Sequence, residues 1–257
     1  MYNYLTHPID KPHPKQELKG ILIALFNTNM SAHYPFAMEL LMSLEKEAIT
    51  IQECHQLLRE VYILIVRRKI ANLRTTKFDT FFPPLAKSII NEPDKIKAFQ
   101  SNVQKDGLWV SDQEFAQSFV SKELYNSREL NFTRHVLQEI DKKLQKFGEY
   151  PDYTSISSIE HIIPQTLDEH WKGYLGKDSY DLELPKLINT IGNLCLNSPS
   201  ANSSKGQKSF NDKVSMYNDI SALAKDIKQR NEPWNLDAVK KRSLEMADIA
   251  LDIWNWN

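Results

Sequence analysis

A histidine and a carboxylate stand side by side in a short apolar run at residues 159–164, which reads Ile-Glu-His-Ile-Ile-Pro. A second apolar run, Leu194–Leu196, follows Asn193 and ends in a Ser-Pro-Ser turn. Both runs are typical of short strands, and a helix that carries Asn202 and Lys205 is expected to begin at the turn. Two strands and a helix would therefore bring an imidazole, a carboxylate, an amide and an ammonium group together.

This set of groups could hydrolyse a phosphodiester bond. The reaction needs a base that deprotonates water, positive charge beside the phosphate, and help for the leaving oxygen. Imidazole is neutral near pH 7 and can accept a proton, so His161 is the candidate general base. Glu160, its neighbour on a strand, would point to the opposite face unless the backbone bends there. Lys205, one helical turn beyond Asn202, would contact a phosphate as a point charge.

The pattern resembles the HNH (His-Me finger) nucleases, which combine an acid-His-Ile-x-Pro segment, an Asn-Leu pair and an Asn-x-x-Lys segment. More closely, residues 160–166, 191–194 and 198–206 resemble the C-terminal nuclease domain of GmrSD-type restriction enzymes, which SspE-type phosphorothioate-sensing restriction proteins share. The motif resemblance covers residues 150–257. It implies a ββα-metal fold and a metal-dependent DNA endonuclease that nicks or cleaves DNA in defence against phage.

The resemblance also assigns roles to single residues. Glu160 and the side-chain carbonyl of Asn202 would hold a divalent metal, at a strand end where the backbone leaves regular β geometry. Asn193 would brace the loop that carries His161. A carboxylate and an amide oxygen, completed by water and phosphate, form a hard ligand set that favours Mg²⁺ or Mn²⁺ over Zn²⁺. Many HNH enzymes have a histidine where this chain has Asn202, and the amide strengthens the preference for Mg²⁺.

DNA affinity cannot come from a generally basic surface, because the formal net charge is −1. A local patch of lysines around the motif is the candidate phosphate-binding surface. Its members are Lys205, Lys208 and Lys213, with Lys186 as a further candidate.

Two clusters outside the motif allow more than one interpretation. Basic residues close a predicted helix and either complement its dipole or contact phosphate; they are Arg67, Arg68, Lys69 and Arg74. Aromatic residues in a polar insertion, residues 165–190, either anchor a long loop or stack on bases; they are Trp171, Tyr174 and Tyr180.

The rest of the chain predicts a mainly α-helical fold, since 7 glycines are few for a turn-rich β protein. A Thr50–Glu53 capping box opens a long helix that continues through Ile70. Pro83-Pro84 should break or kink the next helix, and residues 91–110 are expected to be a polar connection. Apolar spacing predicts further helices, at residues 17–30, 35–44, 130–147, 217–229 and 235–254.

We expect two domains, a helical domain or linker at residues 1–150 and an HNH nuclease domain at residues 151–257, wrapped by C-terminal helices. The resemblance implies a partner absent from this chain, an N-terminal or separate sensor and NTPase domain. Cys54 and Cys195 lie far apart without a CxxC pattern, which argues against a disulfide framework or zinc knuckle. No apolar run reaches the length of a membrane span, so a cytoplasmic protein is expected.

A second hypothesis comes from another functional class. The chain could be a catalytically silent helical module that binds DNA or a partner protein through a vestigial nuclease fold. The presence of Glu160, His161, Asn193 and Asn202 together argues against such decay. A nicking assay with and without Mg²⁺ separates the two hypotheses.

Overall fold

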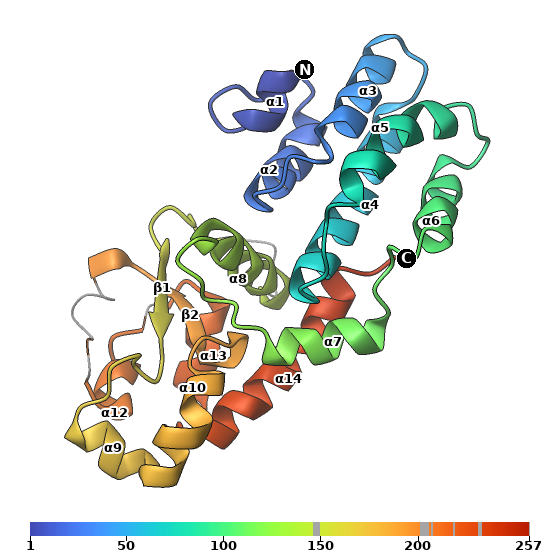
Figure 1. Cartoon of the computed structure of the whole chain (residues 1–257). Coiled ribbons are helices and arrows are strands. Elements are labelled where there is room, and N and C mark those ends of the chain that lie inside the picture. The colour runs from blue at the N-terminus through green and yellow to red at the C-terminus, as the bar shows by residue number, and fades with distance from the viewer. Residues whose placement is uncertain (146–149, 201–205, 207, 218, 231–232, 257) are drawn as a thin grey trace. The chain divides into compact units, whose positions relative to one another are not determined.

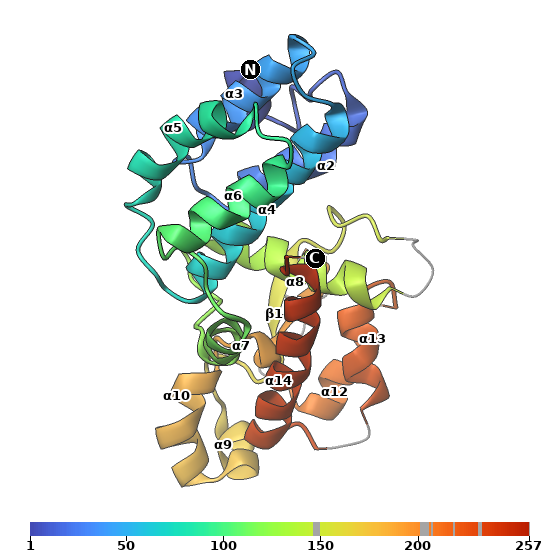
Figure 2. The ribbon, with the colours of Figure 1, turned by 90° about the vertical axis from the view of Figure 1, so that its right-hand side faces the viewer.

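The computed structural model describes residues 1–145, 150–200, 206, 208–217, 219–230 and 233–256. The fold is mainly α-helical, as predicted, and its described strands form a two-stranded antiparallel sheet (Figures 1 and 2). The chain divides into two compact units. The first unit comprises Met1–Ser111 and Trp254–Asn257, and the second comprises Asp112–Ile253. No helix in the described ranges is long and apolar enough to cross a membrane.

The first unit is built from helices. They are α1 (Tyr2–Thr6), the 3-10 turn η1 (Gln16–Leu18), α2 (Lys19–Asn27), α3 (Tyr34–Glu45), α4 (Ile51–Ile70), α5 (Phe78–Ile89) and α6 (Lys95–Lys105). The first of them, α1, is a short helix that buries Leu5. A helix also occupies residues that were expected to be a polar connection, because Phe99 and Val103 are buried on one face of α6.

Helix α4 lies at the centre of the first unit and contacts α2, α3 and α6. The predicted capping box opens it: the Thr50 hydroxyl accepts from the Glu53 backbone N–H, and the Glu53 carboxylate accepts from the Thr50 N–H. Residues 61–66 place buried aliphatic and aromatic side chains on every side of the helix, and residues 63–66 are fully buried. A helix that is apolar all round must be covered on every face, which explains its central place.

Helix α5 continues through Pro83 and Pro84, so the predicted break does not occur. Each proline removes a helical hydrogen bond. The helix is nevertheless held along one face by buried aromatic and aliphatic side chains, which are Phe78, Phe81, Phe82, Leu85 and Ile89.

The second unit combines helices with the sheet. Its elements are α7 (Asp112–Ser121), α8 (Leu130–Leu144), β1 (Ser158–His161), α9 (Glu169–Leu175), the π-helical segment η2 (Ser179–Glu183), α10 (Leu184–Leu187), the 3-10 turn η3 (Ile191–Asn193), β2 (Leu194–Asn197), α12 (Phe210–Val214), α13 (Ala222–Gln229) and α14 (Leu236–Ile253). Strand β2 contacts α8 and α13, and α14 contacts α7, α8 and η3.

The division between the units lies at Ser111, whereas the sequence pattern placed a domain boundary near Tyr150. The difference comes from α7 and α8, which pack on C-terminal elements of the second unit. Their apolar faces were visible in the sequence, but their packing partners were not. Helices α7 and α14, for example, lie more than one hundred residues apart in the chain.

Candidate active site

The site is organised by β1 and β2, which pair with Glu160 opposite Cys195 and His161 opposite Leu194. Strand β2 is buried along its whole length, and its pairing partner ends at the edge of the core. The apolar residues of the two runs therefore fix the sheet in the core. The polar side chains Glu160 and His161 are placed where the strand ends.

Arg242 of α14 ties the turn before β2 to the C-terminal helix. Its Nη1 donates to the backbone oxygens of Gly192 and Leu194, at 3.0 and 2.8 Å. Its Nε donates to Asp226 at 3.0 Å, and the side chain is fully buried. A buried guanidinium with a carboxylate and two carbonyl partners holds this turn rigidly.

Gly192 lies directly against α14. Its N–H donates to Ser243 Oγ at 3.1 Å, and a Cβ atom at this position would lie 2.1 Å from the backbone oxygen of Val239. The helix backbone cannot yield to such a contact, so a glycine is required here for close approach.

Asn193 links the two halves of the site. Its side-chain Oδ1 accepts from the Ile163 N–H at 2.8 Å, and its Nδ2 donates to the oxygens of Ile163 and Ile188 at 3.0 and 2.9 Å. The side chain is fully buried, so these hydrogen bonds satisfy it inside the protein. The amide thus fixes the segment that immediately follows His161, whereas its part in catalysis stays a prediction.

The imidazole of His161 is half-buried between Asn189 and Tyr125. Its Nε2 lies 3.1 Å from Asn189 Oδ1, and the Tyr125 ring meets it edge-on with centroids 4.5 Å apart. An amide oxygen only accepts, so Nε2 carries the hydrogen and Nδ1 is the nitrogen that can take a proton. The pKa of His161 is lowered to about 4, mainly by burial; the Asn189 hydrogen bond opposes this shift, and the Lys213 charge adds to it. The ring is therefore neutral at pH 7.

Glu160 is buried and paired with a lysine from α12. Lys213 Nζ donates to Glu160 Oε1 at 3.0 Å and to the backbone oxygens of His161 and Ile162, at 3.0 and 3.2 Å. The Lys213 side chain is 1% exposed. Burial lowers the pKa of Lys213, and Glu160 opposes that shift by charge and hydrogen bonding.

Lys213 therefore does not belong to a DNA-contacting surface, and the expectation that placed it there is wrong. Its side chain is 1% exposed, and its ammonium group already donates to Glu160 and to two backbone oxygens at the end of β1. The sequence suggested otherwise because a lysine in a polar stretch is usually exposed.

Glu160 and His161 open into the same small cavity, here called the β1 pocket, of about 240 Å³. Neighbours on a strand normally face opposite sides, and they share this pocket where β1 ends. The pocket is lined by Tyr125, Ile159, Glu160, His161, Pro164, Gln165, Gly206 and Lys213.

The described residues offer few ligands for a metal ion. No group of three or more His, Cys, Asp or Glu side chains gathers in this part of the chain. Glu160 offers the carboxylate oxygens that Mg²⁺ and Mn²⁺ prefer, and it shares them with the Lys213 ammonium. Asn202, the second expected ligand, lies outside the described residues.

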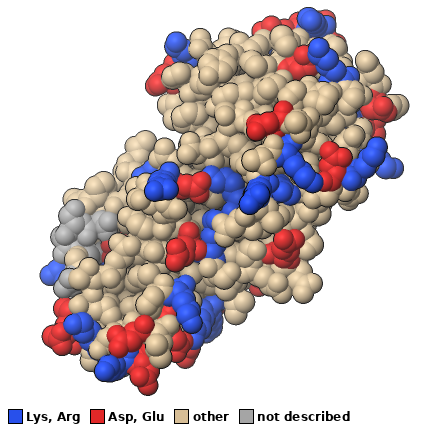
Figure 3. Space-filling view, viewed as in Figure 1, with Lys and Arg blue, Asp and Glu red and all other residues tan. Residues whose placement is uncertain are grey.

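The structure describes only some of the lysines that were expected to bind phosphate. Lys205 lies outside the described residues, while Lys208 is exposed and its backbone oxygen accepts from Trp171 Nε1 at 3.0 Å. Lys186 is exposed on α10. Figure 3 shows basic and acidic side chains interspersed on the visible face of the second unit, in keeping with the net charge.

The arginine cluster of the first unit divides into buried and exposed members. Arg67 donates to the backbone oxygens of Val110 and Trp254, and Arg68 donates to that of Leu108. Both side chains are buried, whereas Arg74 is exposed. Arg67 and Arg68 hold the first unit together and are not available to phosphate.

Sequence patterns did not reveal three of the site's residues: Asn189, Tyr125 and Arg242. Asn189 supports the region twice, because its side chain contacts His161 and its backbone oxygen accepts from Leu124 and Tyr125. None of the three stands in a motif, and the residues each contacts are distant in sequence.

A family of known proteins matches this part of the chain. No curated protein matches the chain. A family model described as the C-terminal domain of GmrSD restriction endonucleases matches residues 109–249. The match covers more than half of the chain and includes the sheet, the β1 pocket and helices α7 to α13. The chain therefore belongs to the family of GmrSD restriction endonuclease C-terminal domains.

Proposed function

We propose that this chain is a metal-dependent DNA endonuclease module of a restriction system, with an HNH-type ββα-metal site. One observation carries the proposal: Glu160 and His161 line one pocket at the end of β1, and Asn193 fixes the segment behind them. Membership of a restriction endonuclease family makes DNA the expected substrate.

His161 would act as the general base through Nδ1. Asn189 holds Nε2–H and so fixes both the ring orientation and the nitrogen that accepts the proton from water. In the protein without bound DNA, the His161 imidazole is a weak base, because its pKa is lowered to about 4. A bound phosphate would favour the imidazolium form and raise this pKa during the reaction.

Glu160, together with Asn202, would hold Mg²⁺ or Mn²⁺. The bound cation would supply positive charge that stabilises the phosphate and the leaving oxygen. The chain's own contribution is to fix the carboxylate, which Lys213 does by an ion pair inside the protein.

Lys213 would serve as a positioning residue. Its three hydrogen bonds join the Glu160 carboxylate to the backbone at the end of β1, so the acid and the base keep a fixed relation. It also neutralises a buried carboxylate that would otherwise carry a large desolvation cost.

DNA would be held by phosphate contacts from Lys208 and Lys205. Such contacts carry no sequence information, so selection of modified DNA would fall to a separate sensor and NTPase domain. Cleavage by this module alone should therefore tolerate any sequence.

A plasmid-nicking assay with and without Mg²⁺ tests the proposal. His161→Ala should lower the rate by about 10²–10⁴-fold while DNA binding stays nearly unchanged, since the base acts on the nucleophile. His7→Ala, at an exposed histidine of the first unit, is the matched control and should cut normally. A His161→Ala variant that cuts at the wild-type rate would remove His161 from the mechanism.

The alternative is a module that binds DNA or protein and does not cut it. The observation that favours this alternative is the Lys213–Glu160 pair, which already neutralises the expected metal ligand. Absence of cleavage with Mg²⁺ and with Mn²⁺, under conditions in which DNA is bound, would support it.

A further inference from the structure

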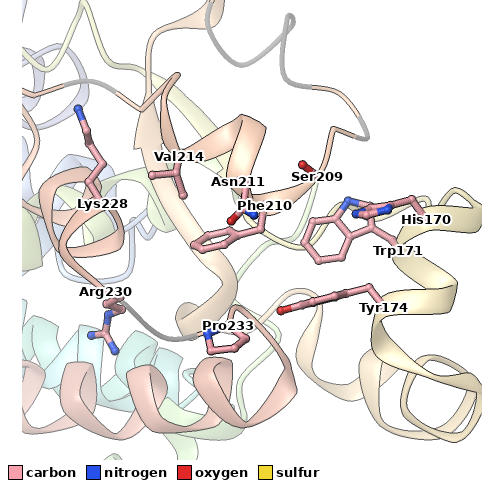
Figure 4. A pocket seen from close by; sticks show the side chains of 10 residues that line it. All are labelled: His170, Trp171, Tyr174, Ser209, Phe210, Asn211, Val214, Lys228, Arg230 and Pro233. Atoms are coloured by element: carbon pink, nitrogen blue, oxygen red, sulfur yellow. The ribbon is translucent and has the colours of Figure 1, made fainter.

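A second cavity of about 650 Å³ lies between α9 and α12, and we call it the α9–α12 pocket. Figure 4 shows Trp171 and Tyr174 of α9 approaching it from one side and Phe210 of α12 from another. Its lining is aromatic at the centre and polar around the rim, the mixture that suits a flat ring with hydrogen-bonding edges. The polar rim residues are His170, Ser209, Asn211, Lys228 and Arg230.

Trp171 forms a fixed wall of this pocket. Its side chain is 1% exposed, and its Nε1 donates to the Lys208 backbone oxygen. The anchoring interpretation thus holds for Trp171. Tyr174 is different: its ring is 44% exposed and meets Trp171 edge-on, with centroids 5.7 Å apart. A ring held from one side and open on another can receive a stacking partner.

Helix α12 connects the two pockets. Phe210 at its start lines the α9–α12 pocket and stacks on buried Trp234, with centroids 5.4 Å apart. Lys213 on the same helix binds Glu160 in the β1 pocket. A DNA strand at the β1 pocket would therefore have the aromatic pocket beside it.

The cations at the rim are already neutralised. Lys228 pairs with Asp219 at 2.5 Å, and Arg230 pairs with Asp226 at 2.9 Å and also contacts Glu245. A phosphate would find little uncompensated positive charge there. An uncharged ring, with the exposed His170 and Asn211 available at its edges, fits this pocket better than a phosphate does.

We propose that the α9–α12 pocket binds an unpaired DNA base, which stacks on Tyr174 with its polar edges toward Asn211 and His170. A base inside a duplex is stacked on both faces, so the occupant must be single-stranded, terminal or flipped out. The choice of DNA as the source of the ring rests on the proposed function. The pocket then gives the module a preference for distorted or open DNA near the cut.

Binding of two short oligonucleotides in EDTA tests the proposal without cleavage. One probe is a single-stranded oligothymidylate, and the other is an abasic strand of equal length and charge. We expect the wild-type protein to bind the thymidylate strand about 5- to 150-fold more tightly, the range that base–aromatic stacking supplies. Fluorescence anisotropy measures both affinities, and the ratio cancels the phosphate contribution.

Three variants make the result specific to Tyr174. Tyr174→Ala should abolish the preference, and Tyr174→Phe should keep it because the ring remains. Tyr150→Ala, at another exposed tyrosine of the same unit, should also keep it. Equal affinity of the wild-type protein for both strands, or an unchanged preference in Tyr174→Ala, would overturn the proposal. Because the readout is binding in EDTA, it can succeed or fail independently of whether His161→Ala stops cleavage.

Discussion

Both units bury cationic side chains, but they satisfy them with different partners. Arg67 and Arg68 of the first unit donate to backbone oxygens of their own unit. Lys213 of the second unit donates to two backbone oxygens and also to the carboxylate of Glu160, beside an open pocket. The arginines stood in a conspicuous basic cluster and proved structural. Lys213, which was expected on a DNA-contacting patch, lies buried beside the candidate site, so the partner of a buried cation is more informative than its clustering.

The largest effect is expected from removing the two cations in parallel, as Lys213→Met and Arg67→Met. Breaking a buried ion pair by removing one partner costs about 3–5 kcal/mol, so Lys213→Met should strongly lower protection of β1 and β2. Arg67→Met leaves two carbonyls without their donor and should lower protection around α4. Hydrogen exchange resolved by segment measures each unit separately.

The comparison sharpens when nicking is measured on the folded fraction of each variant. Lys213→Met should reduce the rate by about 10²-fold, because the acid and base lose their fixed relation. Arg67→Met should leave the rate of its folded fraction unchanged. Equal loss of activity in both variants would mean that Lys213 has a structural role of the same kind as Arg67.

Asn189→Ala is expected to have the next largest effect, about 10²-fold on the cleavage rate, since the imidazole loses its orientation. It should also lower the pKa of His161 further, because the Asn189 hydrogen bond raises that pKa. Nuclear magnetic resonance titration of the histidine ring protons measures this shift. Asn3→Ala, an exposed asparagine of the first unit, serves as control. A His161 signal that titrates as in the wild-type protein would contradict the proposed contact.

Acid should weaken both units through buried histidines. Burial lowers the pKa of His33 in the first unit to about 3, and the pKa values of His135 and His161 in the second unit to about 4. In the unfolded state these histidines have a pKa of about 6.5 and take up protons below that pH. The free energy of unfolding is therefore highest above pH 6.5 and falls as the pH drops toward the folded-state pKa values, about 6.5 being the unfolded reference. Each histidine contributes a slope of at most about 1.4 kcal/mol per pH unit.

His33→Phe isolates the first unit in this experiment. Neither ring nitrogen of His33 has a hydrogen-bond partner among the residues that the structure describes. Its side chain is buried, so phenylalanine should fit without losing a hydrogen bond. Hydrogen exchange should be measured at pH 7 and pH 5. The first unit of the variant should lose less protection at pH 5 than the first unit of the wild-type protein. If the first unit of the variant loses as much protection at pH 5 as in the wild-type protein, and the second unit is unaffected, groups other than His33 govern the acid response of the first unit.

The smallest effect is expected from Lys208→Ala. If Lys208 contacts one phosphate, the slope of log affinity against log salt should become shallower by about 0.9 on duplex DNA. Lys225→Ala, at an exposed lysine of α13, is the control. Anisotropy titrations at several salt concentrations decide the matter. A slope equal to that of the wild-type protein would place the DNA path away from Lys208.

Local signals in the sequence predicted local structure well. The Thr50 capping box and the apolar spacing that follows it predicted a long helix, and α4 runs over Ile51–Ile70. The two short apolar runs became β1 and β2. Each of these features depends on residues close together in the chain.

What the sequence concealed depends on contacts between distant residues. The Lys213–Glu160 and His161–Asn189 contacts join segments that no shared periodicity relates. Pro83 and Pro84 were expected to break or kink a helix. The helix continues through them, because burial of one face outweighs their local cost. The contacts of α7 and α8 with C-terminal elements were hidden for the same reason, since an apolar helix face does not identify its packing partner.

The close approach of Gly192 to α14 has a consequence for the order of events during synthesis. Arg242 and Ser243 hold the turn before β2, yet they emerge from the ribosome well after β2 itself. We therefore expect the nascent chain to carry its acid and histidine in an unassembled state until the C-terminal helix docks. The proposed active site would thus form only after α14 has been synthesised.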